Sequence, residues 1–378
     1  MTEPEPLQQL DRTYVRFRGR KLSYFSGCDY FRLASHPQVV AALQDGVEEY
    51  GLNVAASRLT TGNHILYHRL EHSLAEFFHA PSALLVSTGY TSNFVVAQAL
   101  AGNFSHALID AESHPSLSDA VRFLDCPVLR FEHQNTEDLA RSVRRCGAGA
   151  RLILLTEGLF SLDGSVAPLA QYLRRLPKDA WTLVDDAHGV GVLGRTGQGS
   201  LEHAGVARRR IIQTITLSKA FGAYGGAILG SAGLRQKILN RSQLFVGSTP
   251  LPLPLANAAL EGIRILKNDR SLRKRLAANL IYTRKALRDS NFAPTETPGP
   301  IITILPKNTK QIGQLKRQLL RARIFPSFIR YLSGPATGYF RFAISSEHSR
   351  EQLDALISVL RQCSVSEGGA QSSSSARS

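Results

Sequence analysis

The sequence is poor in the features that build disulfide frameworks, structural metal sites and membrane spans. Its four cysteines match neither a zinc motif nor a paired spacing, so we expect reduced thiols and no metal. The acidic start lacks an apolar stretch, which argues against a signal peptide. The uncharged run over 242–260 could span a membrane by length, but its three prolines would each remove a helical hydrogen bond. We therefore expect a cytoplasmic protein without a transmembrane segment.

Acidic residues are also scarce relative to basic ones, and the formal net charge is +15. The basic excess is concentrated at 208–210 and between Lys267 and Arg323. It is either a solvated face or a surface that attracts an anionic partner, such as coenzyme A or an acidic carrier protein. The chain lacks the sequence motifs of nucleic-acid-binding domains, so we expect no nucleic-acid partner.

Short apolar runs alternate with helix-length segments through the middle of the chain. Continuous apolar strands of this kind predict a mostly parallel sheet that is buried on both faces, in an α/β fold. Two helices are expected before the first strand, at about 36–50 and 66–79. The predicted strands are 83–86, 107–109, 152–155, 182–184, 211–215 and 227–229.

From about residue 265 the chain becomes basic and helical, with strands expected near 301–305 and 339–344. Ser349 and Gln352 have the spacing of a capping box for a last helix. These patterns predict a smaller α+β domain at the C-terminal end. The expected organisation is an N-terminal arm (1–35), a large domain (36–265), a small domain (266–362) and a disordered tail (363–378).

Polar side chains follow the predicted strands at their carboxyl ends, where open α/β sheets bind ligands. Pyridoxal 5′-phosphate (PLP) needs a lysine for an imine, an acid for its ring nitrogen, a flat group against the ring and donors for its phosphate. Lys219, Asp185, His114 and the backbone at Gly89 could supply these, and His188 could reach the ring hydroxyl. Taken singly, each has an ordinary alternative: a surface lysine, a turn-capping acid, a satisfied histidine, a plain glycine turn.

The motifs occur in one order, and together they resemble the α-oxoamine synthases, a family of fold-type I PLP-dependent transferases. The resemblance runs from about residue 24 to 360. It rests chiefly on Thr-Gly-Tyr-Thr-Ser-Asn (88–93), Glu-Gly-Leu-Phe-Ser-Leu-Asp-Gly (157–164), Asp-Asp-Ala-His-Gly (185–189) and Thr-Leu-Ser-Lys-Ala-Phe-Gly (216–222). The branch that the chain most resembles is 8-amino-7-oxononanoate synthase, an enzyme of biotin synthesis.

The resemblance implies further cofactor contacts. Tyr90 would line the pocket with Gly89, Ser161 would lie near the ring hydroxyl with His188, and Thr216 would reach the phosphate. Thr249 would reach the phosphate of the neighbouring subunit, which implies a homodimer with shared active sites.

The implied reaction is the decarboxylative condensation of an amino acid with an acyl thioester, carried by coenzyme A or an acyl carrier protein. Arg341 would hold the amino-acid carboxylate and Arg12 would meet the acyl substrate. Segments 28–33 and 53–58 depart from the family pattern where substrates should bind. The alternatives are a serine palmitoyltransferase-like or 2-amino-3-oxobutyrate ligase-like enzyme, or a PLP aminotransferase that uses no thioester.

Overall fold

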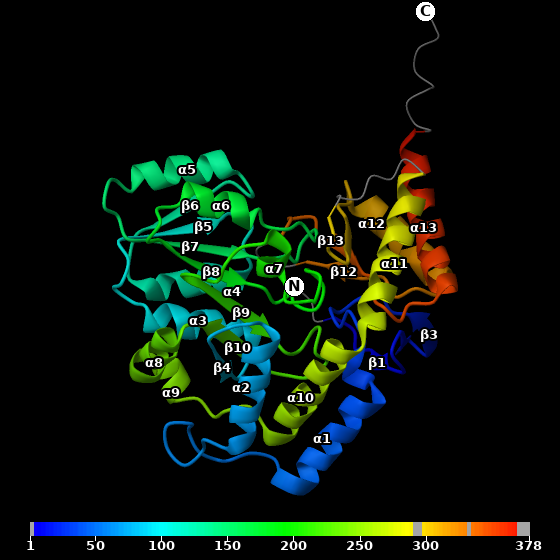
Figure 1. Ribbon diagram of the computed structural model, residues 1–378. Helices are drawn as coiled ribbons and strands as arrows, with labels where there is room; N and C mark the ends of the chain where they lie inside the picture. The colour runs from blue at the N-terminus through cyan, green and yellow to red at the C-terminus, as the bar shows by residue number, and fades with distance from the viewer. Residues whose placement is uncertain (1–3, 290–296, 331–333, 369–378) are drawn as a thin grey trace, which may run out of the picture. The chain divides into compact units, whose positions relative to one another are not determined.

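The computed structural model describes residues 4–289, 297–330 and 334–368 (Figure 1). The chain divides into two compact units. The larger unit contains residues 33–161 and 165–270, and the smaller unit contains 1–32, 162–164 and 271–378. Of the tail predicted at 363–378, residues 369–378 lie outside the described part of the chain, and helix α13 ends at Gly368.

The larger unit is built on a sheet whose described strands run in the order β4-β10-β9-β8-β7-β5-β6. Neighbouring strands from β9 through β6 pair in parallel, and β10 pairs antiparallel with both β9 and β4. The predicted α/β fold with a mostly parallel sheet is therefore confirmed. The strands are β4 (Ser82–Val86), β5 (His106–Asp110), β6 (Val128–Phe131), β7 (Leu152–Glu157), β8 (Trp181–Asp185), β9 (Ile211–Thr216) and β10 (Gly226–Gly230).

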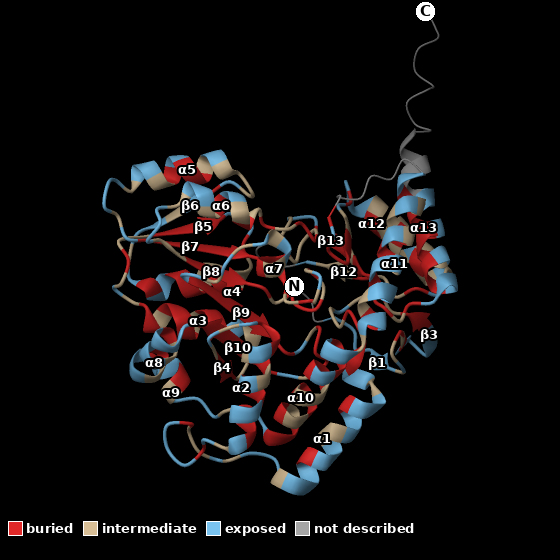
Figure 2. Cartoon of the chain, in the orientation of Figure 1, coloured by how far each residue is buried: buried red, intermediate tan, exposed pale blue. Residues whose placement is uncertain are grey.

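The six predicted strands of this sheet are confirmed, and β6 is an additional strand. Its side chains are exposed or half-buried except for Phe131, so it lacks the continuous apolar run that identifies the other strands. The central strands β7 and β9 are buried along their whole length (Figure 2).

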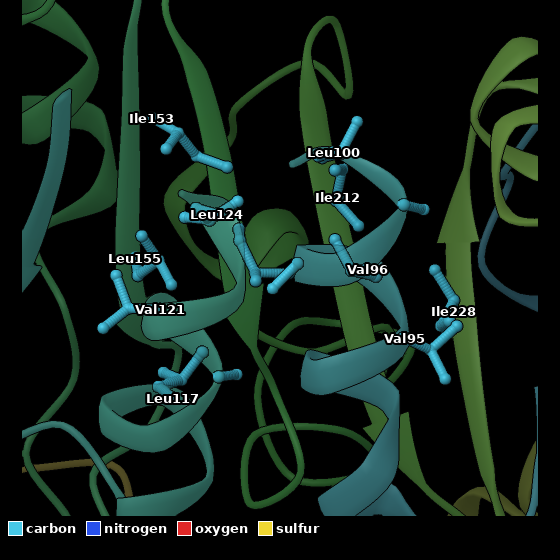
Figure 3. Packing of buried hydrophobic residues seen from close by; sticks show 14 of the residues in the cluster. Val95, Val96, Leu100, Leu117, Val121, Leu124, Ile153, Leu155, Ile212 and Ile228 are labelled. Atoms are coloured by element: carbon cyan, nitrogen blue, oxygen red, sulfur yellow. The ribbon is translucent and has the colours of Figure 1, made fainter. Parts of the chain in front are cut away.

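Successive residues of a strand point to opposite faces of the sheet, so the buried strands present apolar side chains on both faces. Helices cover both of these faces. Ile153 and Leu155 pack on the face covered by α3 and α4 (Figure 3), whereas Leu152 and Leu154 pack on the face covered by α5 and α6. The helices of the larger unit are η1 (Leu33–Ser35), α1 (Pro37–Tyr50), α2 (Ile65–Phe77), α3 (Gly89–Ala99), α4 (Pro115–Ala120), η2 (Val121–Leu124), α5 (Thr136–Arg145), α6 (Leu169–Arg175), α7 (Ser200–Ala204), α8 (Ala232–Arg241), α9 (Gln243–Val246) and α10 (Leu253–Asn268). The two helices predicted before the first strand correspond to α1 and α2.

The smaller unit contains two short sheets, ordered β1-β2-β3 and β11-β13-β12 in its described part. The strands predicted near 301–305 and 339–344 are β11 and β13, and the capping box is present: Gln352 N–H donates to Ser349 Oγ, and Ser349 N–H donates to Gln352 Oε1. The elements are β1 (Gln8–Gln9), β2 (Tyr14–Phe17), β3 (Arg20–Ser23), α11 (Arg270–Arg288, whose first residue belongs to the larger unit), β11 (Ile301–Ile304), α12 (Thr309–Arg321), β12 (Phe328–Ile329), β13 (Tyr339–Ala343) and α13 (Arg350–Gly368).

The run at 242–260 forms no single helix: α9 ends at Val246 and α10 begins at Leu253. Among the residues that the structure describes, every helix is too short or too polar to cross a membrane.

Candidate active site

Lys219 and His188 meet at the carboxyl end of the larger sheet. Lys219 follows β9, and His188 follows the neighbouring parallel strand β8. The Nζ atom of Lys219 lies 2.7 Å from Nε2 of His188, which is 6% exposed. The amine therefore has a neighbour with which it can share or exchange a proton.

Asp185 ends β8 and accepts three hydrogen bonds. Its Oδ2 accepts from Nδ2 of Asn93 at 2.7 Å and from Oγ of Ser116 at 3.3 Å, and its Oδ1 accepts from the backbone N–H of Ala187 at 3.1 Å. An ionised carboxylate is an acceptor only, so this set of donors suits a negatively charged Asp185. The carboxylate is thus held in place from three directions.

Asn93 and Ser116 were not among the residues that we predicted for the site. Asn93 is fully buried on α3, and its Oδ1 accepts from Oγ1 of Thr214 at 2.7 Å, so its amide can turn only its NH₂ group toward Asp185. The sequence signal that could have identified Asn93 is its spacing from Gly89. Asn93 follows Gly89 by four residues, which places both on the same face of α3.

Asp186, the next residue, points to a different environment. Its Oδ2 accepts from the backbone N–H of Ser200 at 2.7 Å and from Nε2 of Gln213 at 2.6 Å. Burial raises the pKa of Asp186 to about 6. The two adjacent aspartates therefore differ in role: Asp186 holds the start of α7, and Asp185 faces Asn93.

His114 caps α4 and is fixed through its backbone and its ring. Nδ1 accepts from the backbone N–H of Ser116 at 3.2 Å and lies 2.8 Å from Oγ of the same residue. The backbone N–H of His114 donates to Oε1 of Glu157 at 2.8 Å. Tyr90 lies edge-on to the His114 ring with a centroid distance of 6.1 Å, and it is 46% exposed.

The start of α3 packs closely against the end of β9. Thr88 forms a capping box with Thr91, which leaves the first backbone N–H groups of α3 at this edge of the sheet. A Cβ atom on Gly89 would lie 2.6 Å from Cβ of Thr216, so only glycine fits there. Oγ1 of Thr216 lies 2.6 Å from Oγ of Ser218. The arrangement has the helix N-terminus and hydroxyl groups that bind phosphate in other proteins.

Ser161 and Thr249 lie at the margins of this cluster. Ser161 is half-buried, and its backbone N–H points to the Glu157 carboxyl. Thr249 is exposed, and its carbonyl accepts from Oγ of Ser87 at 3.3 Å. Thr249, Ser87 and Thr91 help to line a cavity of ≈ 50 Å³.

Arg12 and Arg341 belong to the smaller unit. Nη1 of Arg12 forms an ion pair with Glu347 at 2.9 Å, and its other nitrogens donate to the carbonyls of Phe31 and Arg32. Arg341 lies on β13, with Nη2 at 3.7 Å from Sγ of Cys28. Their roles toward substrates stay predictions.

Residues 28–360 match the aminotransferase class I and II family. The chain belongs to this family. It is 36% identical over 345 residues to the 8-amino-7-oxononanoate synthase of Thioalkalivibrio sulfidiphilus, covering 90% of this chain and 88% of that protein. The enzyme of Methylococcus capsulatus is 36% identical over 352 residues, covering 92% and 90%. The predicted resemblance to the α-oxoamine synthases is confirmed.

Solved structures in the same family have the same fold. The serine palmitoyltransferase of S. paucimobilis with a bound PLP–myriocin aldimine matches with a TM-score of 0.90 and 25% identity, covering 97% of this chain and 94% of that chain. The enzyme of Sphingomonas wittichii matches with the same TM-score and coverage at 29% identity. The predicted fold-type I architecture is confirmed.

Proposed function

We propose that this protein is a PLP-dependent acyltransferase that condenses an amino acid with an acyl thioester and releases carbon dioxide, as an 8-amino-7-oxononanoate synthase does. The observation that carries the proposal is the grouping of Lys219, His188, Asp185 and Asn93 at the carboxyl ends of β8 and β9. It occurs in a chain that is 36% identical to 8-amino-7-oxononanoate synthases over most of its length.

The residues of the site fit PLP. The cofactor requires an amine, an anion for its ring nitrogen and donors for its phosphate. The amine is Lys219. The anion is Asp185, whose carboxylate is held by hydrogen bonds. The phosphate donors are the first backbone N–H groups of α3 and the hydroxyl of Thr216. Gly89 leaves room beside Thr216 that a side chain would fill. When bound, PLP supplies an electron sink for the charge left at the amino-acid α-carbon.

Each residue has a distinct task in this proposal. Lys219 would bond to the cofactor and move the proton of the α-carbon, and His188 would orient its amine. Asp185 would hold a proton on the ring nitrogen, and His114 would lie against the ring. Ser161 would contact the ring hydroxyl, and Tyr90 would close the pocket. The predicted Arg341 and Arg12 would hold the amino-acid carboxylate and the acyl substrate.

The condensation forms one carbon–carbon bond and breaks the α-C–H, C–S and α-C–carboxyl bonds; one proton returns to the α-carbon and one goes to the leaving thiolate. The α-carbon of the amino acid bonds to the thioester carbonyl, the thiol leaves, and the amino-acid carboxyl leaves as CO₂. Exclusion of water and the fixed charges of the site would lower the barrier, since both act on the charge that develops. We also propose a cytoplasmic homodimer in which Thr249 serves the site of the partner subunit.

Borohydride reduction tests the cofactor assignment. Reduction of the PLP-loaded protein, followed by peptide mapping, should place the pyridoxyl group on Lys219, and Lys219→Ala should take up no label. Lys237→Ala on α8 is the matched control and should label normally. A label on another lysine would overturn the assignment.

Thiol release identifies the substrates. Alanine with a pimeloyl thioester should give the fastest release if the enzyme works as an 8-amino-7-oxononanoate synthase. A second candidate is a serine palmitoyltransferase-like reaction, favoured by the TM-score of 0.90 over 97% of this chain. It predicts serine and a long-chain acyl thioester instead. Formation of a 2-oxo acid without thiol release would indicate an aminotransferase.

A further inference from the structure

Two carboxyl groups stand side by side at the edge of the sheet. Glu157 ends β7 and Asp185 ends β8, and the two residues are partners in the parallel register. Both are buried, with 3% and 8% exposure. Two negative charges this close and this poorly solvated repel each other strongly, so one carboxyl of such a pair keeps its proton.

The hydrogen bonds indicate which carboxyl is ionised. Asp185 accepts from the Asn93 amide, the Ser116 hydroxyl and one backbone N–H. Glu157 accepts from backbone N–H groups, those of His114 and Ser161.

The charged groups that face Glu157 come from two further strands of the sheet. They are Asp185 at the end of β8, which repels an anion, and Lys219 after β9, which favours one. Burial is the main cause that raises the pKa of Glu157 well above its ordinary value, and the negative charge of Asp185 is the second. The positive charge of Lys219 opposes this rise only in part.

We propose that Glu157 is a positioning residue that functions in its protonated form. Its neutral carboxyl holds the backbone of His114 and leaves Asp185 as the ionised member of the pair. The inference rests on the proposed function for its catalytic consequence. A second anion beside Asp185 would compete for the positive charge of the cofactor ring and weaken the hold of Asp185 on the ring proton. The neutral Glu157 avoids this competition.

The proposal makes Glu157→Gln the decisive variant. A glutamine has the shape of a protonated glutamate and a carbonyl oxygen that can accept the His114 N–H, but it cannot ionise. Glu157→Ala removes the acceptor, and the buried N–H of His114 loses its partner. We expect Glu157→Gln to keep wild-type kcat/KM and pH profile, and Glu157→Ala to lose about tenfold or more.

The protonation itself is measured in the full-length protein without cofactor. The infrared difference spectrum of wild type minus Glu157→Gln should show a protonated carboxyl band at neutral pH. Since the folded protein then binds a proton that the unfolded chain releases, wild-type stability relative to Glu157→Gln should decrease as pH rises above the unfolded glutamate pKa, about 4.3. Absence of both effects would overturn the proposal.

The two hypotheses fail in different ways. If Glu157→Gln loses as much kcat/KM as Glu157→Ala, the charge of Glu157 is required and the inference is wrong, whatever the cofactor does. If PLP fails to label Lys219, the proposed function is wrong, and the infrared and stability measurements still decide the protonation of Glu157.

Discussion

Nδ2 of Asn93 lies 2.7 Å from Oδ2 of Asp185, although 92 residues separate them in the sequence. The opposite end of the same amide accepts from Thr214 on β9. Helix α3 and two strands are thereby joined through one buried side chain beside the proposed ring-nitrogen site.

Asn93→Ala should weaken the hold of Asp185 on the cofactor. A hydrogen bond to a charged group contributes about 1.5–3 kcal/mol, so cofactor affinity or kcat should fall by about ten- to a hundredfold. Asn93→Asp should be at least as damaging, because it removes the amide donor and places another carboxyl beside Asp185. The readouts are cofactor affinity from visible absorbance and the melting temperature. Wild-type affinity in Asn93→Asp would contradict the role.

Gly89→Ala should impair cofactor retention, because the new methyl group would collide with Thr216 at the start of α3. The matched control is Gly313→Ala on α12, where the new Cβ meets only the flexible end of Arg317 at 3.3 Å. Alanine within a helix is favoured over glycine by about 1 kcal/mol, so the control should be neutral or stabilised. Dialysis against buffer and thermal melting measure both effects, and equal cofactor loss in the two variants would refute the steric argument.

Glu71→Gln should destabilise the larger unit strongly. Glu71 is buried, forms ion pairs with Arg58 and Arg235, and accepts the backbone N–H of Leu85. Removing one charge of such a buried pair costs about 3–5 kcal/mol, since the arginines lose their counterion.

The control for Glu71 lies on the same helix. Glu76→Gln breaks the exposed pair with Lys267, whose contribution is about 0–1 kcal/mol. In urea unfolding, Glu71→Gln should lose several times more unfolding free energy than Glu76→Gln. Similar losses would show that burial does not set the strength of these pairs.

Acid should destabilise the smaller unit through His348. Its ring is buried, stacks on Phe25 at 4.1 Å and contacts Ser345 and the carbonyl of Tyr24. Burial, and after it Arg32, lower the pKa of His348 to about 3. Between this pKa and the unfolded pKa, His348 therefore binds a proton in the unfolded chain but not in the folded chain. Stability from this group is complete above the unfolded pKa of about 6.5 and is lost as pH falls toward 3, by at most about 1.4 kcal/mol per pH unit.

The measurement is urea unfolding of wild type and His348→Gln between those pH values. The difference in unfolding free energy between the two should shrink as pH falls. A control, His72→Gln, replaces an exposed histidine on α2 and should leave the wild-type slope unchanged. A pH-independent difference for His348→Gln would contradict the buried, neutral ring.

Much of the fold and part of the candidate site could be read from local sequence patterns. Buried strands such as β7 and β9 are continuous apolar runs, because both of their faces are covered. The start of α13 is predicted by the Ser349–Gln352 capping box. The motifs around Gly89, Asp185 and Lys219 predicted the cofactor chemistry, since these residues follow strands whose ends meet at one edge of the sheet.

Only the tertiary structure decided which polar residues touch. Asn93 and Ser116 meet Asp185 because helices α3 and α4 pack on the sheet, and Glu157 stands beside Asp185 because β7 and β8 pair in parallel. The same holds for His348, whose low pKa arises from burial against Phe25 and Arg32 and not from its sequence neighbours. Local sequence sets the residue types and the secondary structure, because those depend on near neighbours. The proton on Glu157 and the charge on Asp185 depend on desolvation and on contacts between distant segments, which exist only after the chain has folded.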